Sequence, residues 1–509
     1  QGLHLFTMEY FWGLELIRPL VIYFVLERVV KDRRDLFRQT LKTLIPYLLI
    51  FVSTIFWRLF IYAPIDDPNA LRWLSMLFDE PIKAIIHLVE MVLGDLLFLM
   101  IATWFDTLRV ELIDLDSMFL VASWGIVIFV GTILYFYVRN LKQSDVDSDD
   151  SIKSKSQMAI LGLLVMLLGP LPVWLTNKQI IAGRFSDRFA LAAMLGASIL
   201  LVVIFELILS KRLMLVVLVC ALAGLATGSH VRIANEYRWA WTKQRRFYWQ
   251  LKWRVPQLES GTAIFSDGGI FTYTGDYPVS FALGLLYQAE NELETTQPPY
   301  WFFELDSGFN YYQKYFLRGH ELHGKLRNIA FDGWSTDSII IDYDPDQGSC
   351  LWVVGEGDEL VETLPDLTRS ALPMADLSRI SLPETDDGEM GIPALFGDAP
   401  PHTWCYYFQK AELARQFGDW ERVVELAKEV DRQQFSPQNR FEWRPFVDAY
   451  LHLGEYQSAY ANTTQAFQAD DDTGEMFCSL WRSTLDQNPG DTKLADFTAR
   501  VVGELDCPE

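Results

Sequence analysis

Six apolar runs in the first 230 residues are each long enough for a helix to cross the hydrocarbon core of a bilayer, which is roughly 30 Å thick. They lie near residues 10–28, 43–62, 118–138, 157–176, 188–209 and 213–230. The pattern predicts an α-helical polytopic membrane domain over residues 1–230. Gln1-Gly2-Leu3-His4-Leu5 has no initiator methionine and no basic region before an apolar stretch, so we expect an internal start rather than a signal peptide.

A seventh apolar stretch, 82–105, carries Lys83, His87, Glu90 and Asp95. A charge at the centre of a span costs about 2.5–3.5 kcal/mol, which makes this stretch a poor crossing helix. We therefore predict that 82–105 is a re-entrant or interfacial helix on the outer face of the membrane.

Basic residues gather in three links between the spans, and such links stay in the cytoplasm. They are 28–42, the link after residue 138, and the short link 210–212. All three share one side only if residues 63–117 do not cross the membrane, or cross it twice. The many acidic residues of 63–117 suit an outer loop, so the chain from residue 231 onward is expected outside the cytoplasm.

The composition agrees with a chain made of two unlike parts. Its 509 residues hold 66 acidic and 43 basic side chains, a formal net charge of −23, yet half are hydrophobic. Nucleic-acid binding is disfavoured, because no long basic stripe offsets the acidity. Five cysteines are too few for a dense disulfide framework, and none are spaced as in a zinc site, so no metal is expected. In the polar half, one or two disulfides and free thiols both remain open.

The polar half begins with an aromatic and basic stretch, 231–255, which we interpret as a juxtamembrane helix with its Trp and Tyr rings at the level of the lipid headgroups.

The pattern of residues 256–390 predicts a soluble α/β module. Its β-rich runs are 262–266, 270–274, 337–343 and 350–354, with a helix over 279–293. The acidic loop DYDPDQG after the third run predicts a hairpin turn rather than a calcium site. Residues 355–400, rich in Pro, Asp and Gly, predict a linker.

Residues 391–509 predict an α-helical repeat domain. Helices are expected over 407–418, 420–432, 441–453 and 456–468, with further helices near 476–486 and 492–505. The turns Gly418-Asp419-Trp420 and Gly454-Glu455-Tyr456 stand 36 residues apart. This spacing resembles that of tetratricopeptide repeats, whose period is about 34 residues. Such repeats bind a protein partner in a groove, and a purely structural role is the alternative.

Two sets of charged residues are candidates for function in the membrane domain. Glu15 and Arg18 lie three residues apart on one helix face, so they can form an intramembrane charge pair that is either functional or a packing anchor. Lys178, Arg184 and Arg188 lie on the outer loop 177–188, where cations suit a lipid phosphate or serve as ordinary interfacial anchors.

Three residues of the segment 82–105 are candidates for the same cavity as the outer loop. His87, Glu90 and Asp95 could face that loop, and the spacing of His87 and Glu90 allows metal or proton chemistry. Because no third ligand is in view, we assign no metal to them.

Three features together resemble the carboxy-terminal portion of bacterial polytopic membrane glycosyltransferases of the GT-C type. They are EYFWGLELIRPL followed by a basic linker and PYLLIFVSTIFWRLFIY, the stretch GRFSDRFALAAMLGASILL, and the repeat-bearing tail. The segment from RVPQLESGTAIF to DYDPDQGSCLWVV is also similar to the outer domain of membrane proteins from Chloroflexus-like bacteria. The resemblance implies transfer of sugars from polyprenyl-phosphate donors on the outer face of the inner membrane, without a further cofactor.

The chain departs from that family in one respect. The catalytic acid of the family lies in the first outer loop, and no Asp here matches it, so we assign no catalytic residue and leave enzymatic activity open. The resemblance leads us to expect membrane lipid, a polyprenyl-phosphate sugar and a protein partner of the repeat tail as ligands. The alternative is a non-enzymatic scaffold subunit of an envelope or surface assembly.

Overall fold

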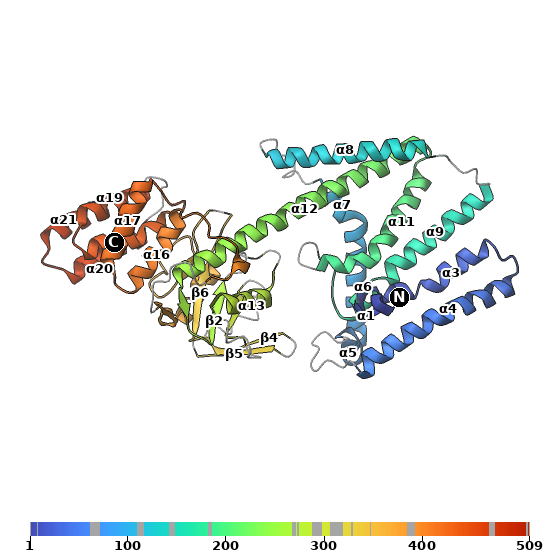
Figure 1. The fold of residues 1–509 in the computed structure, drawn as a ribbon, viewed down its shortest axis with the longest axis horizontal. Coiled ribbons are helices and arrows are strands. Elements are labelled where there is room, and N and C mark those ends of the chain that lie inside the picture. The colour runs from blue at the N-terminus through green and yellow to red at the C-terminus, as the bar shows by residue number, and fades with distance from the viewer. Residues whose placement is uncertain are drawn as a thin grey trace. The chain divides into compact units, whose positions relative to one another are not determined.

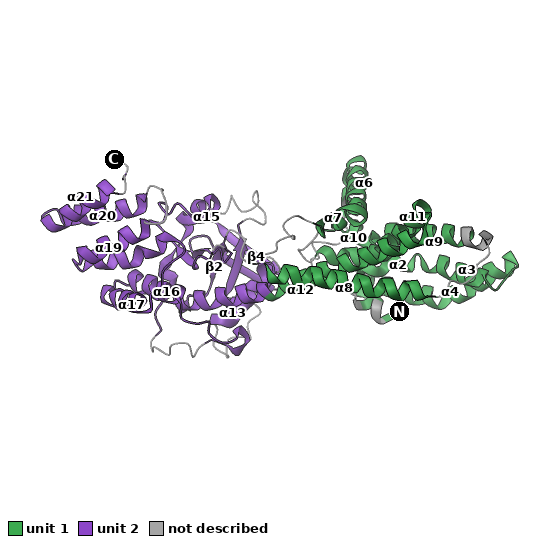
Figure 2. Cartoon of the chain, turned by 90° about the horizontal axis from the view of Figure 1, so that it is seen from above, with its two compact units in different colours: residues 1–238 green, residues 239–509 purple. Residues whose placement is uncertain are grey.

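The computed structural model describes residues 2–7, 9–61, 72–108, 117–141, 148–181, 186–266, 271, 274–287, 298–305, 319–326, 329–346, 348–383, 392–467, 474–504 and 507. The chain divides into two compact units, unit 1 over residues 1–238 and unit 2 over residues 239–509 (Figure 2). Unit 1 is helical throughout its described residues, whereas unit 2 combines strands and helices (Figure 1). Each unit is described separately below.

The helices of unit 1 follow the apolar runs of the sequence. They are α1 (Gly2–Thr7), η1 (Glu9–Phe11), α2 (Trp12–Glu15), α3 (Arg18–Glu27), α4 (Arg33–Phe56), η2 (Trp57–Ile61), α5 (Arg72–Asp79), α6 (Pro81–Leu97), η3 (Phe98–Ala102), α7 (Thr103–Asp106), α8 (Met118–Asn140), α9 (Ser148–Leu168), α10 (Leu171–Leu175), η5 (Ser186–Ala190) and α11 (Leu191–Ile208), and α12 (Arg212–Arg254) leads into unit 2.

Six helical stretches of the described residues are long and apolar enough to cross a membrane: 33–56, 81–106, 118–140, 153–175, 186–208 and 212–254. Five of them overlap predicted spans, but the first predicted span, 10–28, is not among them. It divides at Leu16 and Ile17 into α2 and α3, and Pro19 lies in the first turn of α3. Proline has no amide hydrogen to donate, so it fits the start of a helix rather than its interior.

The stretch 81–106, in which we predicted a re-entrant or interfacial helix, is long enough to span but has a different direction from its neighbours. In both views α6 runs across the direction of α4 and α8 (Figures 1 and 2). An interfacial helix lies in the membrane plane and therefore across its spanning neighbours. The length of this helix thus suits a membrane-spanning role, whereas its direction suits an interfacial one.

Ion pairs bring the ends of three helices of unit 1 close together. Lys153 Nζ, near the start of α9, lies 2.8 Å from Glu27 Oε1 at the end of α3. Lys155 Nζ lies 3.4 Å from Glu206 Oε2 near the end of α11. The basic links that follow or precede these helix ends therefore lie on the same side of unit 1.

Small residues allow α9 and α11 to pack closely. A Cβ atom added to Gly196 would lie 2.5 Å from the carbonyl oxygen of Gly162 and 2.6 Å from the amide nitrogen of Met166. Ala192, Ala193 and Ala197 are buried along the same helix. Small residues of this kind let helix backbones approach within a membrane, where van der Waals packing replaces the hydrophobic effect.

Helix α12 is longer than its predicted apolar span and differs in part from the juxtamembrane interpretation. Tyr237, Trp239 and Trp241 are about half exposed, as suits rings near lipid headgroups. In contrast, Tyr248 and Trp249 are buried in unit 2. The carboxy-terminal part of the predicted headgroup helix is therefore a core element, because its aromatic rings contact protein rather than lipid.

A four-stranded sheet forms the centre of unit 2, in the order β3-β2-β6-β7. Strand β2 (Thr262–Ser266) is parallel to β3 (Tyr300–Glu304) and β6 (Ser338–Asp342), and β7 (Trp352–Val354) is antiparallel to β6. The acidic loop between β6 and β7 is the predicted hairpin turn. The strand predicted at 270–274 lies largely outside the described residues.

Both faces of the sheet are covered, so the central residues of β2 and β6 are all apolar and do not alternate with polar ones. One face, with Ile264 and Ile339, packs against the end of α12 and α13 (Asp276–Tyr287). The other face, with Phe265 and Ile340, packs in a core shared with the helices that follow and with the hairpin β4 (Glu321–Leu326) and β5 (Ile329–Trp334). The smaller elements are β1 (Gln257–Leu258) with β8 (Ile380–Ser381), α15 (Asp366–Ala371), η7 (Leu372–Met374), η8 (Leu377–Arg379) and η9 (Ala394–Phe396).

The predicted linker 355–400 contributes to the core, so this interpretation was wrong for its described residues. Leu364, Leu372 and Phe396 are buried. Arg444 forms buried ion pairs with Asp358 of this segment and with Glu412. Burial opposes ionisation of Glu412, but Arg415 and Arg444 prevail and lower the pKa of Glu412 to about 2.

Three helical hairpins complete unit 2: α16 (Trp404–Gln416) with α17 (Trp420–Gln433), η10 (Arg440–Trp443) and α18 (Arg444–His452) with α19 (Tyr456–Phe467), and α20 (Glu475–Gln487) with α21 (Thr492–Glu504). These bounds agree with the predicted helices. Gly418 and Gly454 both have a positive φ, of 72° and 74°, and close equivalent turns. The hairpins share one core with the sheet, whereas the sequence predicted separate domains over 256–390 and 391–509.

Two disulfides lie in unit 2, Cys350–Cys405 and Cys478–Cys507. Cys220 of unit 1 is a buried free thiol. Of the two states that the sequence left open for the polar half, the structure has disulfides.

We predict that Gly196→Ala lowers the free energy of unfolding by about 1–3 kcal/mol, because the new methyl group overlaps the backbone of α9. Gly125→Ala on α8 is the matched control, since a Cβ atom there meets nothing within 4 Å. Thermal unfolding in detergent measures both. Equal midpoints for the two variants would contradict the close packing of α9 and α11.

Candidate functional site

The candidate site of unit 1 is a group of polar contacts between α6 and the segment that follows α10. Helix α10 ends at Leu175, and Asn177 has a φ of 58°, in the left-handed region that Asn tolerates better than most residues. This turn directs the chain along α6. We call His87, Asp95, Trp174, Asn177 and Ile180 the α6 cluster.

Asp95 is the buried acid of the α6 cluster, with an exposed fraction of 1%. Its Oδ2 accepts a hydrogen bond of 2.8 Å from Trp174 Nε1. Its Oδ1 accepts one of 3.2 Å from the backbone N–H of Ile180. Each carboxyl oxygen thus has a donor, and a buried carboxyl group needs such partners because it has left water.

His87 lies two turns before Asp95 on α6 and contacts the same segment. Its Nε2 is 2.7 Å from Asn177 Oδ1, so the ring must donate from Nε2. The structure therefore brings His87 and Asp95 into contact with residues 177–180 of the loop 177–188. Glu90 lies on α6 between them but is exposed, and it is not part of this group.

Two of the three loop cations lie on one aromatic ring. Lys178 Nζ is 5.6 Å, and Arg188 Cζ 5.2 Å, from the centre of the Phe189 ring. Tyr10 packs edge-on against the same ring, with a centroid distance of 6.0 Å. The structure thus places two positive charges beside the α6 cluster. Arg184 lies outside the described residues.

Glu15 and Arg18 form a bidentate ion pair. Arg18 Nε and Nη2 donate to the two oxygens of Glu15 at 2.6 and 2.7 Å. The Arg18 guanidinium also lies 4.5 Å from the centre of the Tyr47 ring on α4. The pair therefore connects the break between α2 and α3 to α4, which is a packing role that needs no ligand.

The sequence did not single out Trp174, Asn177 or Phe189. Only the fold brings them next to the predicted residues. A weak signal was present, since Asn-Lys directly after a short apolar run is typical of a helix end. Within the described residues, no group of three or more His, Cys, Asp or Glu side chains could hold a metal ion.

No family model, no curated protein and no solved structure matches this chain. Its class is therefore defined by its own architecture, which is a mostly helical protein with six long apolar helices and a strand-containing carboxy-terminal region. These apolar helices indicate insertion in a membrane. The hydrogen bonds of the α6 cluster fix the conformation of the segment after α10. The side chains of Lys178 and Arg188 lie beside this segment.

We predict that Asp95→Ala lowers the free energy of unfolding by about 1–3 kcal/mol for each donor that it leaves unsatisfied, Trp174 Nε1 and the Ile180 N–H. Glu90→Ala, an exposed acid on the same helix, should change it by less than about 0.5 kcal/mol. Thermal unfolding in lipid nanodiscs compares the two. A midpoint for Asp95→Ala at or above that of Glu90→Ala would refute the structural role of this acid.

Proposed function

We propose that this chain is an inner-membrane protein that binds a lipid-linked phosphate beside the α6 cluster, on the side of the membrane opposite to its basic links. The observation that carries the proposal is the convergence of Lys178 and Arg188 on Phe189, next to a loop held by Asp95 and His87. Two adjacent cations at the level of headgroups suit a phosphate or pyrophosphate group. The glycosyltransferase-like motifs make a polyprenyl-phosphate sugar the proposed ligand.

The orientation rests on the ion pairs of unit 1. Because Glu27 and Lys153 are in contact, an even number of crossings must separate them. Helices α4 and α8 supply two crossings, and a third crossing by α6 would make the number odd. The direction of α6 across α4 and α8 supports the same assignment (Figures 1 and 2).

Counting onward from Lys153, the outer loop and unit 2 then lie outside the cytoplasm. Helix α9 with α10 leads outward, α11 returns to the side of Glu27, and α12 leads outward again. The two disulfides of unit 2 support this side, since disulfides persist in oxidising compartments and are rare in the cytosol.

The scaffold function remains a second candidate because of the helical hairpins of unit 2. The turns at Gly418 and Gly454 repeat the same geometry, which supports a relation to tetratricopeptide repeats. Phe417 and Leu453 precede these glycines and are 45% and 37% exposed. Equivalent apolar side chains on successive hairpins offer a contact surface to a protein partner.

We predict that replacing Lys178 and Arg188 together with Ala weakens polyprenyl-phosphate binding about tenfold or more, because each charge-assisted hydrogen bond contributes about 1.5–3 kcal/mol. Titration of undecaprenyl phosphate into the protein in nanodiscs measures the dissociation constant. Lys153→Ala is the control, since Lys153 pairs with Glu27 on the other side. An unchanged dissociation constant in the double variant would exclude the phosphate site and leave the scaffold.

We predict that a cysteine at Arg432, on the exposed face of α17, reacts with a membrane-impermeant maleimide on intact spheroplasts. A cysteine at Arg34, in the basic link, should react only after permeabilisation. The native cysteines do not interfere, because four are paired and Cys220 is buried. Labelling of Arg34→Cys and protection of Arg432→Cys would reverse the orientation.

A further inference from the structure

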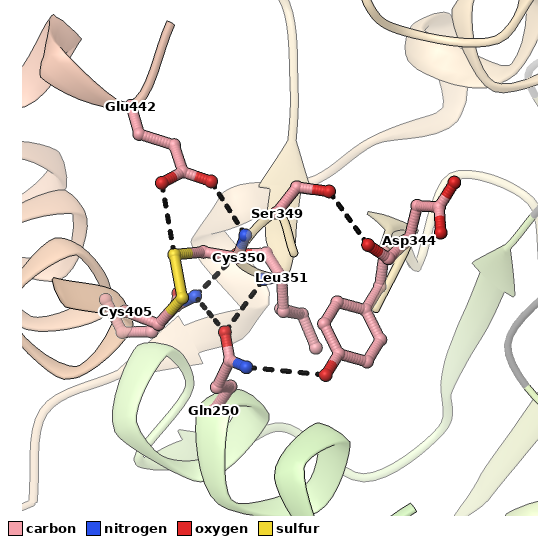
Figure 3. Close-up of a disulfide and its surroundings, with 9 residues drawn as sticks. Gln250, Asp344, Ser349, Cys350, Leu351, Cys405 and Glu442 are labelled. Carbon is pink, nitrogen blue, oxygen red and sulfur yellow. Dashed lines mark hydrogen bonds between the residues drawn. A yellow bond between two sulfur atoms is a disulfide. The ribbon is translucent and has the colours of Figure 1, made fainter. Parts of the chain in front are cut away.

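The disulfide Cys350–Cys405 has an unusual neighbour, the buried acid Glu442 (Figure 3). Cys350 lies just before β7, and Cys405 is in the first turn of α16. Glu442, on η10, is fully buried. Its Oε1 accepts a hydrogen bond of 2.7 Å from the backbone N–H of Cys350, and its Oε2 lies 3.2 Å from the sulfur of Cys350.

This second contact fits a protonated acid. A disulfide sulfur has no hydrogen to donate, so a hydrogen bond exists there only if Glu442 carries the proton and donates it. Burial raises the pKa of Glu442 to about 8, although the hydrogen bond from Cys350 opposes the shift. At neutral pH the structure therefore holds a carboxylic O–H against one sulfur of the disulfide.

The charged side chains around Glu442 pair with one another, and none of those in the described part of the chain forms an ion pair with this acid. The pairs on η10, α16, α18 and the loops before them include Arg444–Asp358, Arg444–Glu412, Arg415–Glu412, Arg415–Asp448 and Arg440–Glu362. Asp346, four residues before Cys350, pairs with Lys243 of α12. The Asp344 carboxylate accepts the backbone N–H of Asp346. Burial is thus the dominant influence on this acid.

The two cysteines differ in exposure. Cys350 is 1% exposed, whereas Cys405 is partly exposed. Thiol–disulfide exchange requires an incoming thiolate to reach one sulfur while the other leaves, and the rate depends on how easily the leaving sulfur accepts charge. Because Cys405 is the more exposed cysteine, we expect the thiolate to attack its sulfur, so that the sulfur that leaves is the one beside the acid.

The surrounding fold does not depend on the sulfur–sulfur bond alone. Gln250 of α12 accepts a hydrogen bond of 2.8 Å from the backbone N–H of Leu351, and Gln409 of α16 donates one of 2.6 Å to the Leu351 carbonyl (Figure 3 shows the first). Together these contacts keep β7 attached to α12 and α16. The bond between Cys350 and Cys405 can therefore open while its two ends stay in place.

We propose that Cys350–Cys405 is an exchangeable disulfide that accepts electrons from a dithiol reductant, with Glu442 as the general acid. A thiolate of the dithiol attacks Cys405 Sγ, a mixed disulfide forms, and the Cys350–Cys405 bond breaks. Its electron pair goes to Cys350 Sγ, which takes the proton of Glu442. The second thiol of the reductant then gives its proton to water and attacks the sulfur of the reductant in the mixed disulfide. Cys405 leaves as a thiolate and takes a proton from water, so the dithiol becomes a disulfide and the protein disulfide is reduced.

The test uses the purified full chain in detergent, with dithiothreitol as the dithiol and glutathione as a trapping monothiol. Mass spectrometry after alkylation follows each cysteine. We expect the glutathione adduct on Cys405. The rate constant per thiolate should be level below about pH 8 and fall about tenfold per pH unit above it, because only protonated Glu442 assists the leaving sulfur.

Glu442→Gln keeps the acceptor for the Cys350 N–H but has no proton to transfer. It should reduce the rate constant at pH 7 at least tenfold and abolish the inflection near pH 8. Reduction of Cys478–Cys507 in the same samples is the internal control and should not change. If the variant fails to fold, the adduct position and the pH profile of the unaltered protein decide. An adduct on Cys350, a profile without an inflection, or resistance to dithiothreitol until unfolding would each overturn the proposal.

Discussion

The contact of Glu27 with Lys153 limits the ways in which the helices of unit 1 can cross a membrane. It joins the end of α3 to the start of α9 across 126 residues of chain, and together with Lys155–Glu206 it gathers the basic links at one end. A membrane makes such a contact informative, because the chain changes sides with every crossing. In the topology that we propose, helix α6 does not cross, which keeps the number of crossings even, and its buried Asp95 bonds to Trp174 of α10 instead of facing lipid.

The same requirement for partners explains the polar interior of unit 2. Arg444, Glu412 and Asp358 are buried together, so each charge has an opposite charge beside it. Removing one member of such a set leaves an uncompensated charge in the core. This set holds the segment after β7 against α16 and α18, which explains how a segment rich in Pro, Asp and Gly comes to be part of the core.

Much of this fold could be predicted from the sequence, because the signals were local. The helices after residue 400 and the strands β2, β6 and β7 follow directly from periodicity and turn residues. The strand β3 was missed because its sheet neighbour β2 comes from a distant part of the chain. The strands β4 and β5 were also missed, although they pair with each other as a local hairpin. In the candidate site, Lys178, Arg188, His87 and Asp95 were found by residue type, but Trp174, Asn177 and Phe189 are defined only by tertiary contacts. The length of apolar runs could not decide between a crossing and an interfacial helix at 81–106, because that depends on direction.

The pairing of the cysteines has a consequence for how the chain matures. Four cysteines can pair in three ways, and here each bridge joins neighbours in chain order, Cys350 with Cys405 and Cys478 with Cys507. An oxidase that meets the nascent chain residue by residue would therefore close each loop as its second cysteine emerges. Native connectivity would arise in order of synthesis, without a shuffling step.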